Sequence, residues 1–567
     1  MNMLLLGWAA WLVAGLAHAQ APASPSAHSF ARRPVPAARA RPTPAPDLIL
    51  FHGKIFTADS ARPYVAALAI KGNKILATGP TLAMQQLASA HTKRLDLRGK
   101  TVVPGFNDAH DHLGWLLPSK NAFVTEFSVP GLPKHGVQDS LARLVRNAAP
   151  GQWLSGTIGL TVFRDRTVRR GFLDSLAPHN PVVLAVHWGH GLVVNSQALH
   201  ALGLADTAAD PLGGWYERAP GTRRLSGALY EYAQFPFWQA LATANPPALV
   251  EGLRAHAQQE LSWGITTVQN LSSTLQGAAA RQYFAQAALP VRTRIIAMPG
   301  TTEQGRSLRE WARPAQVAAG SLTYFSGIKY VVDGTSLEQN ALRTTPYPGR
   351  PGWYGRLNFP LDTLRRIFQE ALVDHRQLLL HITGDSATAL VLQLMKSLAP
   401  AETWRRQRVR MEHGTGITAA AARDVKALGL VVVHTPQYGL RSPLRTWRAL
   451  GIPVAMGPDG DINPFLGILL VTTQQVMPGE NLSREQAVRA YTQGSAYAEF
   501  AEATKGTLKP GMLADLAVLS QDVFSVPAAH LPAIRSVLTI VNGKIVYQAP
   551  KQASPRPVTQ RRSHRGE

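Results

Sequence analysis

The chain has 567 residues, of which 45% are hydrophobic and 16% charged, a composition typical of a folded globular protein rather than a disordered one. It contains no cysteine, which excludes disulfides, thiolate nucleophiles and cysteine-ligated metals, so a metal site would have to use His, Asp, Glu or Lys. The formal net charge of +23 would suit a nucleic-acid partner, but much of the excess lies in terminal segments and no nucleic-acid-binding motif is present, so we expect solvated basic tails and no nucleic acid.

The first 19 residues are predicted to be a secretory signal peptide. The apolar run from Met3 to Leu16 is shorter than the ~20 residues that a spanning helix needs, and Ala17-His18-Ala19 matches a cleavage site. No Lys or Arg precedes the apolar run, so an uncleaved membrane anchor is the alternative. We therefore predict an exported protein, periplasmic or secreted, with no integral membrane segment after cleavage.

Two further terminal segments are predicted not to fold. Residues 20–46 are rich in Ala, Pro, Ser and Arg and are typical of a disordered linker. Residues 550–567 form a basic tail.

Short apolar runs broken by Gly and Asn occur at both ends of the remaining chain and are typical of hairpins. They are DLILFHGKIFT (47–57), VAALAIKGNKILATG (65–79), GTLKPGMLADLAVLS (506–520) and VLTIVNGKIVYQ (537–548). HGKIF and NGKIV look like two copies of one hairpin. We predict that residues 47–105 and 505–549 combine into one small β-sandwich domain.

Between these ends, near-continuous apolar runs alternate with helical stretches, which predicts parallel strands buried on both faces. The eight strand candidates are 101–112, 264–270, 291–299, 327–334, 377–385, 408–414, 429–436 and 452–459. Eight such units predict an α/β fold, a TIM-like (β/α)8 barrel over residues 106–504. The interval of about 118–250 is too long for one helix and is predicted to be an inserted cap subdomain over the barrel mouth. Ser483 and Gln486 form a capping-box pattern that opens a late helix.

Polar side chains cluster at the ends of these predicted strands, where barrel enzymes place their active sites. They are His110, His112, Lys329, His381, His413 and Asp459. Residues two apart on a strand point to the same side, so His110 and His112 can bind one ion together. A single His is often only a hydrogen-bonded loop residue, but so many polar groups would be costly to bury without a function. Imidazole and carboxylate suit zinc, with manganese, iron or nickel as lesser options.

The motifs VVPGFNDAHDHL, GIKYVVDGT, LLLHITGD, RMEHG, AMGPDG and AYTQGSAYAEF…KGTLKPGMLADLAVL together resemble the amidohydrolase superfamily over about residues 47–548. The likeness is greatest to its amidohydrolase-3 branch, which includes N-substituted amide hydrolases. Two ions are implied by this resemblance. His110, His112 and Asp459 would bind the more buried one, and His381 and His413 the other.

The resemblance also implies that Lys329 carries a carbamate derived from CO2, which would bridge the ions. A carbamate is an anion, whereas a bare ammonium would repel the cations. The alternative is an ordinary cationic Lys329 paired with Asp333 beside a single ion. Asp385 and Glu412 adjoin the ligands and are predicted to support them.

The implied reaction is metal-dependent hydrolysis of an amide-type C–N bond in a small molecule. The metal lowers the pKa of its bound water towards ~7, and Asp459 takes the water proton and returns it to the leaving nitrogen. The sequence leaves open a cyclic amide, an N-acyl amino acid, a carbamate or a lactone as substrate. A non-catalytic exported binding protein is the alternative from another class. The oligomeric state, including a homo-oligomer, also stays open.

Some residues depart from the branch's usual pattern. The insert reads His187-Trp188-Gly189-His190 where Asp-Gly-His is frequent, and the last strand reads Gly-Pro-Asp where Gly-Ser-Asp is usual. The residues predicted to contact substrate are His190, Asn195, Glu231 and His434. Aromatic residues of the insert are predicted partly to line an apolar pocket and mostly to form its core.

Overall fold

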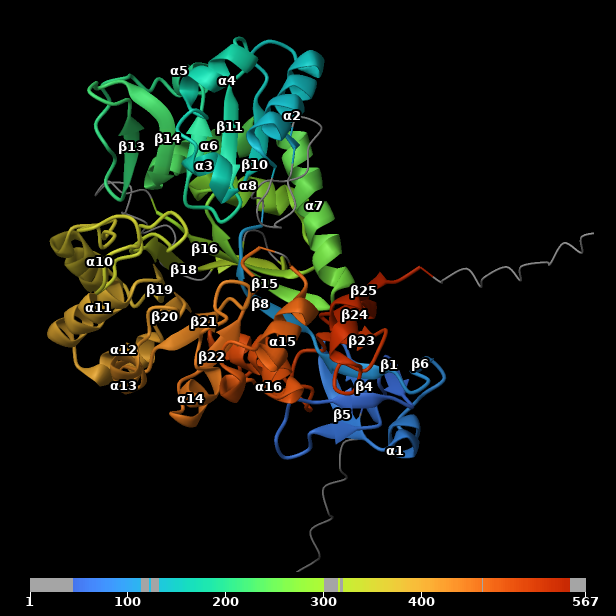
Figure 1. Cartoon of the computed structure of the whole chain (residues 1–567). Helices are drawn as coiled ribbons and strands as arrows, with labels where there is room; N and C mark the ends of the chain where they lie inside the picture. The colour runs from blue at the N-terminus through green and yellow to red at the C-terminus, as the bar shows by residue number, and fades with distance from the viewer. Residues whose placement is uncertain are drawn as a thin grey trace, which may run out of the picture. The chain divides into compact units, whose positions relative to one another are not determined.

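The central sheet of this computed structural model contains eight parallel strands and one short strand, β17 (Ala315–Gln316), that pairs antiparallel with one of them (Figure 1). In spatial order the eight parallel strands are β8 (Phe106–Asp111), β15 (Ile265–Ser272), β16 (Arg292–Ala297), β18 (Thr323–Val331), β19 (Leu378–Ile382), β20 (Arg410–His413), β21 (Val431–His434) and β22 (Val454–Met456). The backbone N–H of Asp459, just beyond β22, donates to the carbonyl of His110 at 3.1 Å and so joins the last strand to the first. The predicted (β/α)8 barrel is confirmed.

The structure describes residues 44–113, 122–123, 132–299, 315–316, 320–460 and 462–550. The predicted signal peptide, nearly all of the predicted linker and nearly all of the basic tail lie outside these ranges. Within them, no helix is both long enough and apolar enough to cross a membrane.

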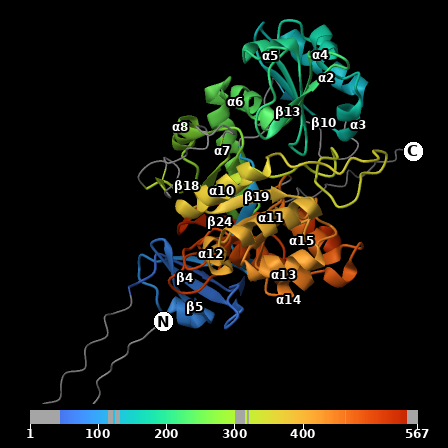
Figure 2. The same ribbon diagram turned by 90° about the vertical axis from the view of Figure 1, so that its left-hand side faces the viewer.

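Helices surround the barrel strands (Figure 2). They are α7 (Pro246–Ser262), α8 (Gly277–Ala287), α10 (Leu361–Val373), α11 (Asp385–Leu398), α12 (Ala401–Gln407), α13 (Ala419–Ala427), α14 (Leu444–Ala449), α15 (Pro464–Thr473), α16 (Arg484–Arg489) and α17 (Ser495–Tyr497). In α10 the buried residues Leu364, Ile367, Phe368 and Ala371 recur at helical spacing and face the strands. The predicted capping box is present, since Ser483 and Gln486 each accept the other's backbone N–H at the start of α16.

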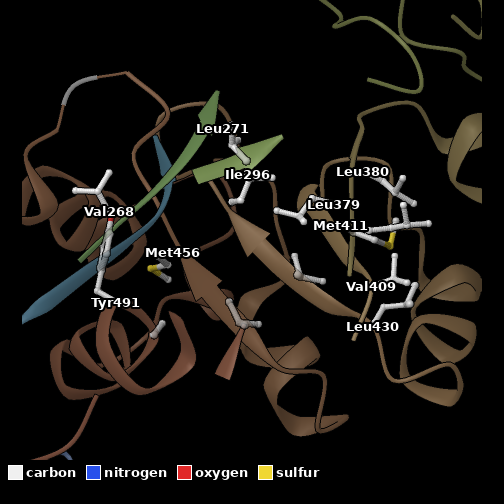
Figure 3. Packing of buried hydrophobic residues seen from close by; sticks show 14 of the residues in the cluster. Val268, Leu271, Ile296, Leu379, Leu380, Val409, Met411, Leu430, Met456 and Tyr491 are labelled. Carbon is white, nitrogen blue, oxygen red and sulfur yellow. The ribbon is translucent and has the colours of Figure 1, made fainter. Parts of the chain in front are cut away.

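Apolar side chains of the strands and helices merge into one large core (Figure 3). It includes Val268, Ile296 and Met411 from the strands and Tyr491 from the segment after α16. This core fixes where each strand ends, and with it the position of the polar side chains that follow.

The segment 101–112, predicted as one strand, is two strands in different sheets. β7 (Thr101–Pro104) pairs with the C-terminal strand β23 (Leu516–Leu519), whereas β8 pairs with β15 in the barrel. Gly105 separates them, and a Cβ atom there would lie 2.1 Å from the Thr266 hydroxyl, so only glycine fits where the chain crosses between the sheets.

The N- and C-terminal segments combine into a small β-sandwich, as predicted. One sheet holds β5, β4, β1 and β6, and the other holds β25, β24, β23, β7, β2 and β3. Their bounds are β1 (Leu48–Phe51), β2 (Lys54–Phe56), β3 (Tyr64–Val65), β4 (Ala67–Lys71), β5 (Lys74–Gly79), β6 (Lys93–Asp96), β23 (Leu516–Leu519), β24 (Ser536–Val541) and β25 (Lys544–Gln548), with the short helix α1 (Thr81–Gln85) beside them. Leu50 and Ile70 from one end of the chain share a core with Leu516 and Ile540 from the other.

Two predicted hairpins are wrong. Residues 506–520 contribute only one strand, β23, which pairs with β7 and β24 rather than with a neighbour inside that segment. The segments 65–79 and 537–548 form antiparallel hairpins, but the strands around HGKIF do not pair with each other. Both edges of β1 are taken, by β4 and by β6, so the turn at His52 and Gly53 carries the chain into the opposite sheet instead.

The predicted insert forms a cap with its own mixed sheet, in the order β13, β14, β12, β11, β10, β9. Its strands are β9 (Ala122–Phe123), β10 (Leu154–Ile158), β11 (Val182–Val186), β12 (Leu192–Val194), β13 (Gly214–Arg218) and β14 (Leu225–Glu231). Its helices are α2 (Lys134–Asn147), α3 (Leu160–Arg164), α4 (Arg170–Leu176), α5 (Ser196–Ala201) and α6 (Phe235–Thr243).

Candidate active site

A cavity of about 70 Å³ lies between the carboxyl ends of the barrel strands and the cap. Its barrel lining is His110, His112, Ser273, Met298, Lys329, Val331, His381, His413 and Asp459. Its cap lining is His187, Trp188, Gly189, His190, Glu231, Gln234, Phe235 and Trp238. The six residues predicted as metal ligands therefore meet in one place, although they come from positions as far apart as 110 and 459.

Asp459 lies at the centre of one group of donors. Its carboxylate oxygens are 3.4 Å from His110 Nε2, 3.6 Å from His112 Nε2 and 3.7 Å from His413 Nδ1. The ligand atoms of His110, His413 and Asp459 lie within 4.8 Å of one another, close enough to share one ion.

A second group of donors adjoins the first. His381 Nδ1 is 2.8 Å from His413 Nε2, and Lys329 Nζ is 3.2 Å from His110 Nε2. His381 is buried, and its Nε2 has no hydrogen-bond partner among the described residues. A buried nitrogen without a partner is costly, which indicates that a group beyond the protein belongs there.

The donor set fits a divalent cation. Burial holds the pKa of His110, His112, His381 and His413 well below the usual range, and neighbouring positive charges lower it further. The four imidazoles are therefore neutral at pH 7 and offer lone pairs, as metal ligation requires. Four imidazoles with one carboxylate form a nitrogen-rich set that suits zinc and similar ions.

Asp459 combines a raised pKa with an unusual backbone conformation. Burial raises the pKa of its carboxyl to about 7, although Lys329 and His190 act in the opposite direction. Its φ of +53° lies in the left-handed region that non-glycine residues rarely adopt. His413 and Glu231, which line the same cavity, also have positive φ, at 71° and 54°. Backbone strain of this kind gathers at functional sites.

Lys329 Nζ lies against His110 rather than Asp333, so the predicted pairing of Lys329 with Asp333 is wrong. The Asp333 carboxylate accepts backbone N–H groups from Thr383, Gly384 and Leu342 at 2.9–3.0 Å and fixes the loop beyond β19. Burial lowers the pKa of Lys329 to about 8, so a larger fraction of its amine is neutral than in water.

The cap supplies a charged pair to the cavity. His190 Nδ1 lies 3.0 Å from Glu231 Oε1, and the His190 ring centroid is 4.5 Å from that of His381. Burial alone would lower the pKa of His190, but the Glu231 carboxylate raises it to about 9. His190 is therefore cationic at neutral pH and can donate a hydrogen bond into the cavity. The structure thus brings two of the four predicted substrate contacts, His190 and Glu231, to the site.

The structure does not bring the other two to the cavity. Asn195 is fully buried and caps α5, with its side chain accepting from Val182 N and Ala198 N and donating to backbone carbonyls. An Asn just before a helix is a common N-cap, and that local signal explains it better than substrate contact. His434 is buried against Gly439, where a Cβ would lie 2.3 Å from the ring, and burial lowers its pKa to about 4. The prediction that Asn195 and His434 contact the substrate is therefore wrong for this cavity, whose lining includes neither residue.

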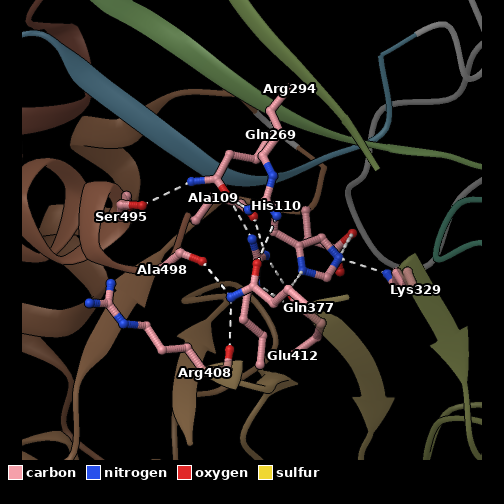
Figure 4. Close-up of polar contacts among 12 residues, drawn as sticks. Ala109, His110, Gln269, Arg294, Lys329, Gln377, Arg408, Glu412, Ser495 and Ala498 are labelled. Carbon is pink, nitrogen blue, oxygen red and sulfur yellow. Dashed lines mark hydrogen bonds and ion pairs between the residues drawn. The ribbon is translucent and has the colours of Figure 1, made fainter. Parts of the chain in front are cut away.

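A buried polar network inside the barrel holds His110, and sequence reasoning missed most of it (Figure 4). His110 Nδ1 lies 2.7 Å from Glu412 Oε2, and both Glu412 oxygens accept from Arg410. Arg410 also donates to the carbonyl of Ala109 and to Gln269, both at 2.6 Å. Because Nδ1 of His110 is engaged in this way, Nε2 is turned toward Asp459.

Glu412 and Asp385 were both predicted to support the ligands, but only Glu412 bonds one of them, His110. Asp385 lies at the start of α11, where it accepts hydrogen bonds from the backbone and the hydroxyl of Thr344 rather than from a proposed metal ligand.

We expect Glu412→Gln to weaken metal affinity by ~10–100-fold, because the partner that orients His110 changes from carboxylate to amide. Metal titration of the purified variant measures this, with Asp385→Asn as the matched control. Equal affinity in Glu412→Gln and wild type would remove Glu412 from the metal site.

Another buried cluster lies behind the ligands. Asp111, His256 and Glu260 bring their ligand atoms within 4.8 Å of one another between β8 and α7. Asp111 is the middle residue of His-Asp-His, so its side chain faces away from its neighbours. His256 lies 3.2 Å from Glu260, and the Asp111 carboxylate raises the pKa of His256 to about 9 against the effect of burial. Their i, i+4 spacing in α7 is the signal that could have predicted this pair.

Comparison with known proteins agrees with this geometry. A model described as the amidohydrolase family matches residues 93–547. The protein LONG AFTER FAR-RED 3 of Arabidopsis thaliana is 26% identical over 88% of this chain and 91% of its own length. N-substituted formamide deformylase of Arthrobacter pascens is 24% identical over 88% of this chain and 98% of its own length. The crystal structure of an uncharacterised metal-dependent hydrolase from Pyrococcus horikoshii has a TM-score of 0.67 at 19% identity, covering 85% of this chain and 99% of that one, and supports the fold alone.

Proposed function

The chain belongs to the amidohydrolase family. We propose that it hydrolyses an N-substituted amide with a small acyl group, in the cavity at the mouth of its barrel. Family membership confirms the sequence-based prediction of an amidohydrolase. The observation that carries the proposal is the meeting of four neutral imidazoles, Lys329 and Asp459 around one cavity. A binding protein without catalysis would have no use for a complete donor set beside a carboxyl whose pKa is near neutrality.

The metal would be held by His110, His112, His381, His413, Lys329 and Asp459. When bound, a divalent cation lowers the pKa of water towards ~7 and polarises the scissile carbonyl. We propose zinc, because nitrogen donors dominate the set.

We further propose a carbamate on Lys329, which the lowered pKa of its amine would favour. An intact mass larger by one CO2 under native conditions would support it, and the unmodified mass in active protein would reject it.

Asp459 is the proposed proton carrier. Its carboxylate accepts a proton from the attacking water and gives it to the leaving nitrogen as the C–N bond breaks. Its contacts of 3.4–3.7 Å with His110, His112 and His413 place this carboxylate beside any water held at the donor set.

His190 is the proposed donor to the carbonyl oxygen. Its Nδ1 is held by Glu231, which leaves Nε2–H for the substrate. The charge on this oxygen grows in the transition state, and a fixed cationic donor stabilises it there. Trp188, Phe235 and Trp238 add apolar surface that limits water around the reacting carbonyl.

The size of the cavity supports a small acyl group, because about 70 Å³ is well below the ~300–1,000 Å³ of pockets that hold a whole drug-sized molecule. The name of one relative, an N-substituted formamide deformylase, supports the same choice.

A panel assay tests the proposed function. N-formyl, N-acetyl and N-benzoyl derivatives of one amine should show kcat/KM falling in that order. A cyclic amide, an N-acyl amino acid, a carbamate and a lactone complete the panel, and the metal content of the same sample is measured. No hydrolysis of any compound by metal-loaded protein would favour the binding-protein alternative.

We propose that the protein is exported, on the basis of its first 19 residues. The mature form is expected to begin at about Gln20. Sequencing the N-terminus of protein recovered from the periplasm or medium checks this, and a chain that still begins at Met1 would favour the membrane anchor.

A further inference from the structure

A second, larger cavity of about 410 Å³ lies on the other side of β14 from the active site. Tyr230 lines this cavity, whereas the next residue, Glu231, lines the active cavity, as the alternation of side chains along a strand requires. Its lining is Phe163, Arg164, Arg166, Arg169, Trp215, Glu217, Tyr230, Glu338, Gln339, Asn340, Arg350, Trp353 and Arg356. The volume falls in the range of small-molecule sites, and the five arginines outnumber the two glutamates.

Aromatic rings hold two of these arginines in place. The Arg356 guanidinium lies 4.3 Å from the Trp215 ring centroid, and Trp215 is in turn stacked on Tyr230 at 4.9 Å with the planes 9° apart. The Arg350 guanidinium lies 4.7 Å from the Trp353 ring, whose N–H donates to the Gln339 carbonyl at 2.6 Å. A guanidinium stacked on a ring keeps its N–H donors free at the edge, pointing away from the ring.

Neither glutamate of the lining forms an ion pair with these two arginines. Glu217 is bound to Arg169 at 2.7 Å. Glu338 is engaged by the indole N–H of Trp188 at 2.9 Å and by Thr335.

Elsewhere in the described chain no carboxylate lies within ion-pair distance of Arg166, Arg350 or Arg356. A concave surface with uncompensated charge of one sign concentrates ions of the opposite sign.

We propose that this cavity binds the anionic group, a carboxylate or a phosphate, of a small molecule. Arg166, Arg350 and Arg356 of the lining supply the charge. The guanidinium fork matches two oxygens of a carboxylate or phosphate, and such charge-assisted bonds are about twice as strong as neutral ones. The proposal does not depend on the hydrolytic function.

The anion site adjoins the active site through one shared wall. Glu338 lines the anion site and accepts the N–H of Trp188, which lines the active cavity. Glu338 also belongs with His190 and Glu231 to a group whose ligand atoms lie within 4.8 Å of one another. A bound anion would therefore lie next to the groups that contact the substrate.

Calorimetric titration with inorganic phosphate and, separately, with benzoate tests the proposal. The proteins are the metal-loaded wild type, the double variant Arg350→Gln/Arg356→Gln, and Arg423→Gln, an exposed arginine on α13, as the matched control. We expect saturable binding to wild type and control, and binding weaker by at least ~10-fold in the double variant, because two charge-assisted contacts are lost. Thermal unfolding of all three proteins checks that the exposed substitutions leave the fold intact.

Each outcome decides the proposal. Tighter binding of benzoate identifies a carboxylate as the ligand group, and tighter binding of phosphate identifies a phosphate. An anion that binds only to the active-site metal would bind wild type and double variant equally, which would overturn the proposal. Absence of saturable binding of both probes to wild type would overturn it as well. None of these results requires hydrolysis, so failure here and failure of the proposed function remain distinguishable.

Discussion

Replacing Asp459 by Asn should lower kcat by ~10²–10⁴-fold while the fold is retained, because that is the usual contribution of a positioned proton-transfer group. Asn keeps the shape and one ligating oxygen but cannot take a proton from water. The present contacts of Asp459 with His110, His112 and His413 at 3.4–3.7 Å show that the side chain occupies the centre of the donor set. Steady-state kinetics on a sample of measured metal content is the relevant assay.

Metal content matters in this experiment because Asn is also a weaker ligand than Asp. If Asp459→Asn turned over at a near-normal rate with full metal occupancy, Asp459 would not carry the proton. Glu412 would be a poor replacement, since both its oxygens are engaged by Arg410 and His110. His190, which is cationic at the cavity wall, could then give a proton to the leaving nitrogen only, and the proton of the attacking water would have to pass to solvent.

Replacing His110 by Ala should abolish metal binding and activity together. We expect the loss of turnover to exceed the ~10⁴-fold upper value for a proton-transfer group, because this substitution removes the ion on which the chemistry depends. His110 is fully buried and contacts Asp459, Lys329 and Glu412. Elemental analysis and kinetics on one sample give both quantities.

His91→Ala, at an exposed position of the β-sandwich, is the matched control and should retain metal and activity. Circular dichroism and thermal unfolding show whether His110→Ala has folded. A folded His110→Ala that retains a full complement of metal would remove this residue from the ligand set, and with it the assignment of the more buried ion.

The meeting of the proposed metal ligands in one place could be predicted because their positions follow from local patterns. Each ligand stands at the end of an apolar run, and the carboxyl ends of parallel barrel strands meet on one face. His110 and His112 are two apart on one strand and therefore point together. The capping box at Ser483 is equally local, since it needs only residues within one helical turn.

What surrounds the ligands depends on contacts that no local pattern encodes. Arg410 and Gln269 lie 141 positions apart, yet bond at 2.6 Å inside the barrel. In the sequence both residues are polar interruptions of apolar strands, and nothing beside them identifies the partner. The strands around HGKIF are a second example. The chain does turn there, as the local sequence predicts, but the strands on either side of the turn pair in two different sheets.

The anion site was also beyond sequence reasoning. Arg166 belongs to the cap, whereas Arg350 and Arg356 lie in the loop after β18, and only folding brings them to one cavity.

At Asn195 the local sequence was informative, but the prediction did not follow it. Resemblance to a family pattern favoured a substrate contact, while the more local feature, an Asn directly before a helix, predicted the N-cap that the structure has.

The central claim is that hydrolysis depends on a divalent ion held by these residues. The most direct test follows metal per chain and amide hydrolysis together while a chelator removes the metal and Zn²⁺ is then added back. We expect activity to fall in proportion to metal content, to be absent from metal-free protein and to return with one to two ions per chain. Metal-free protein that is shown to be folded and still hydrolyses the amide at the original rate would contradict this claim.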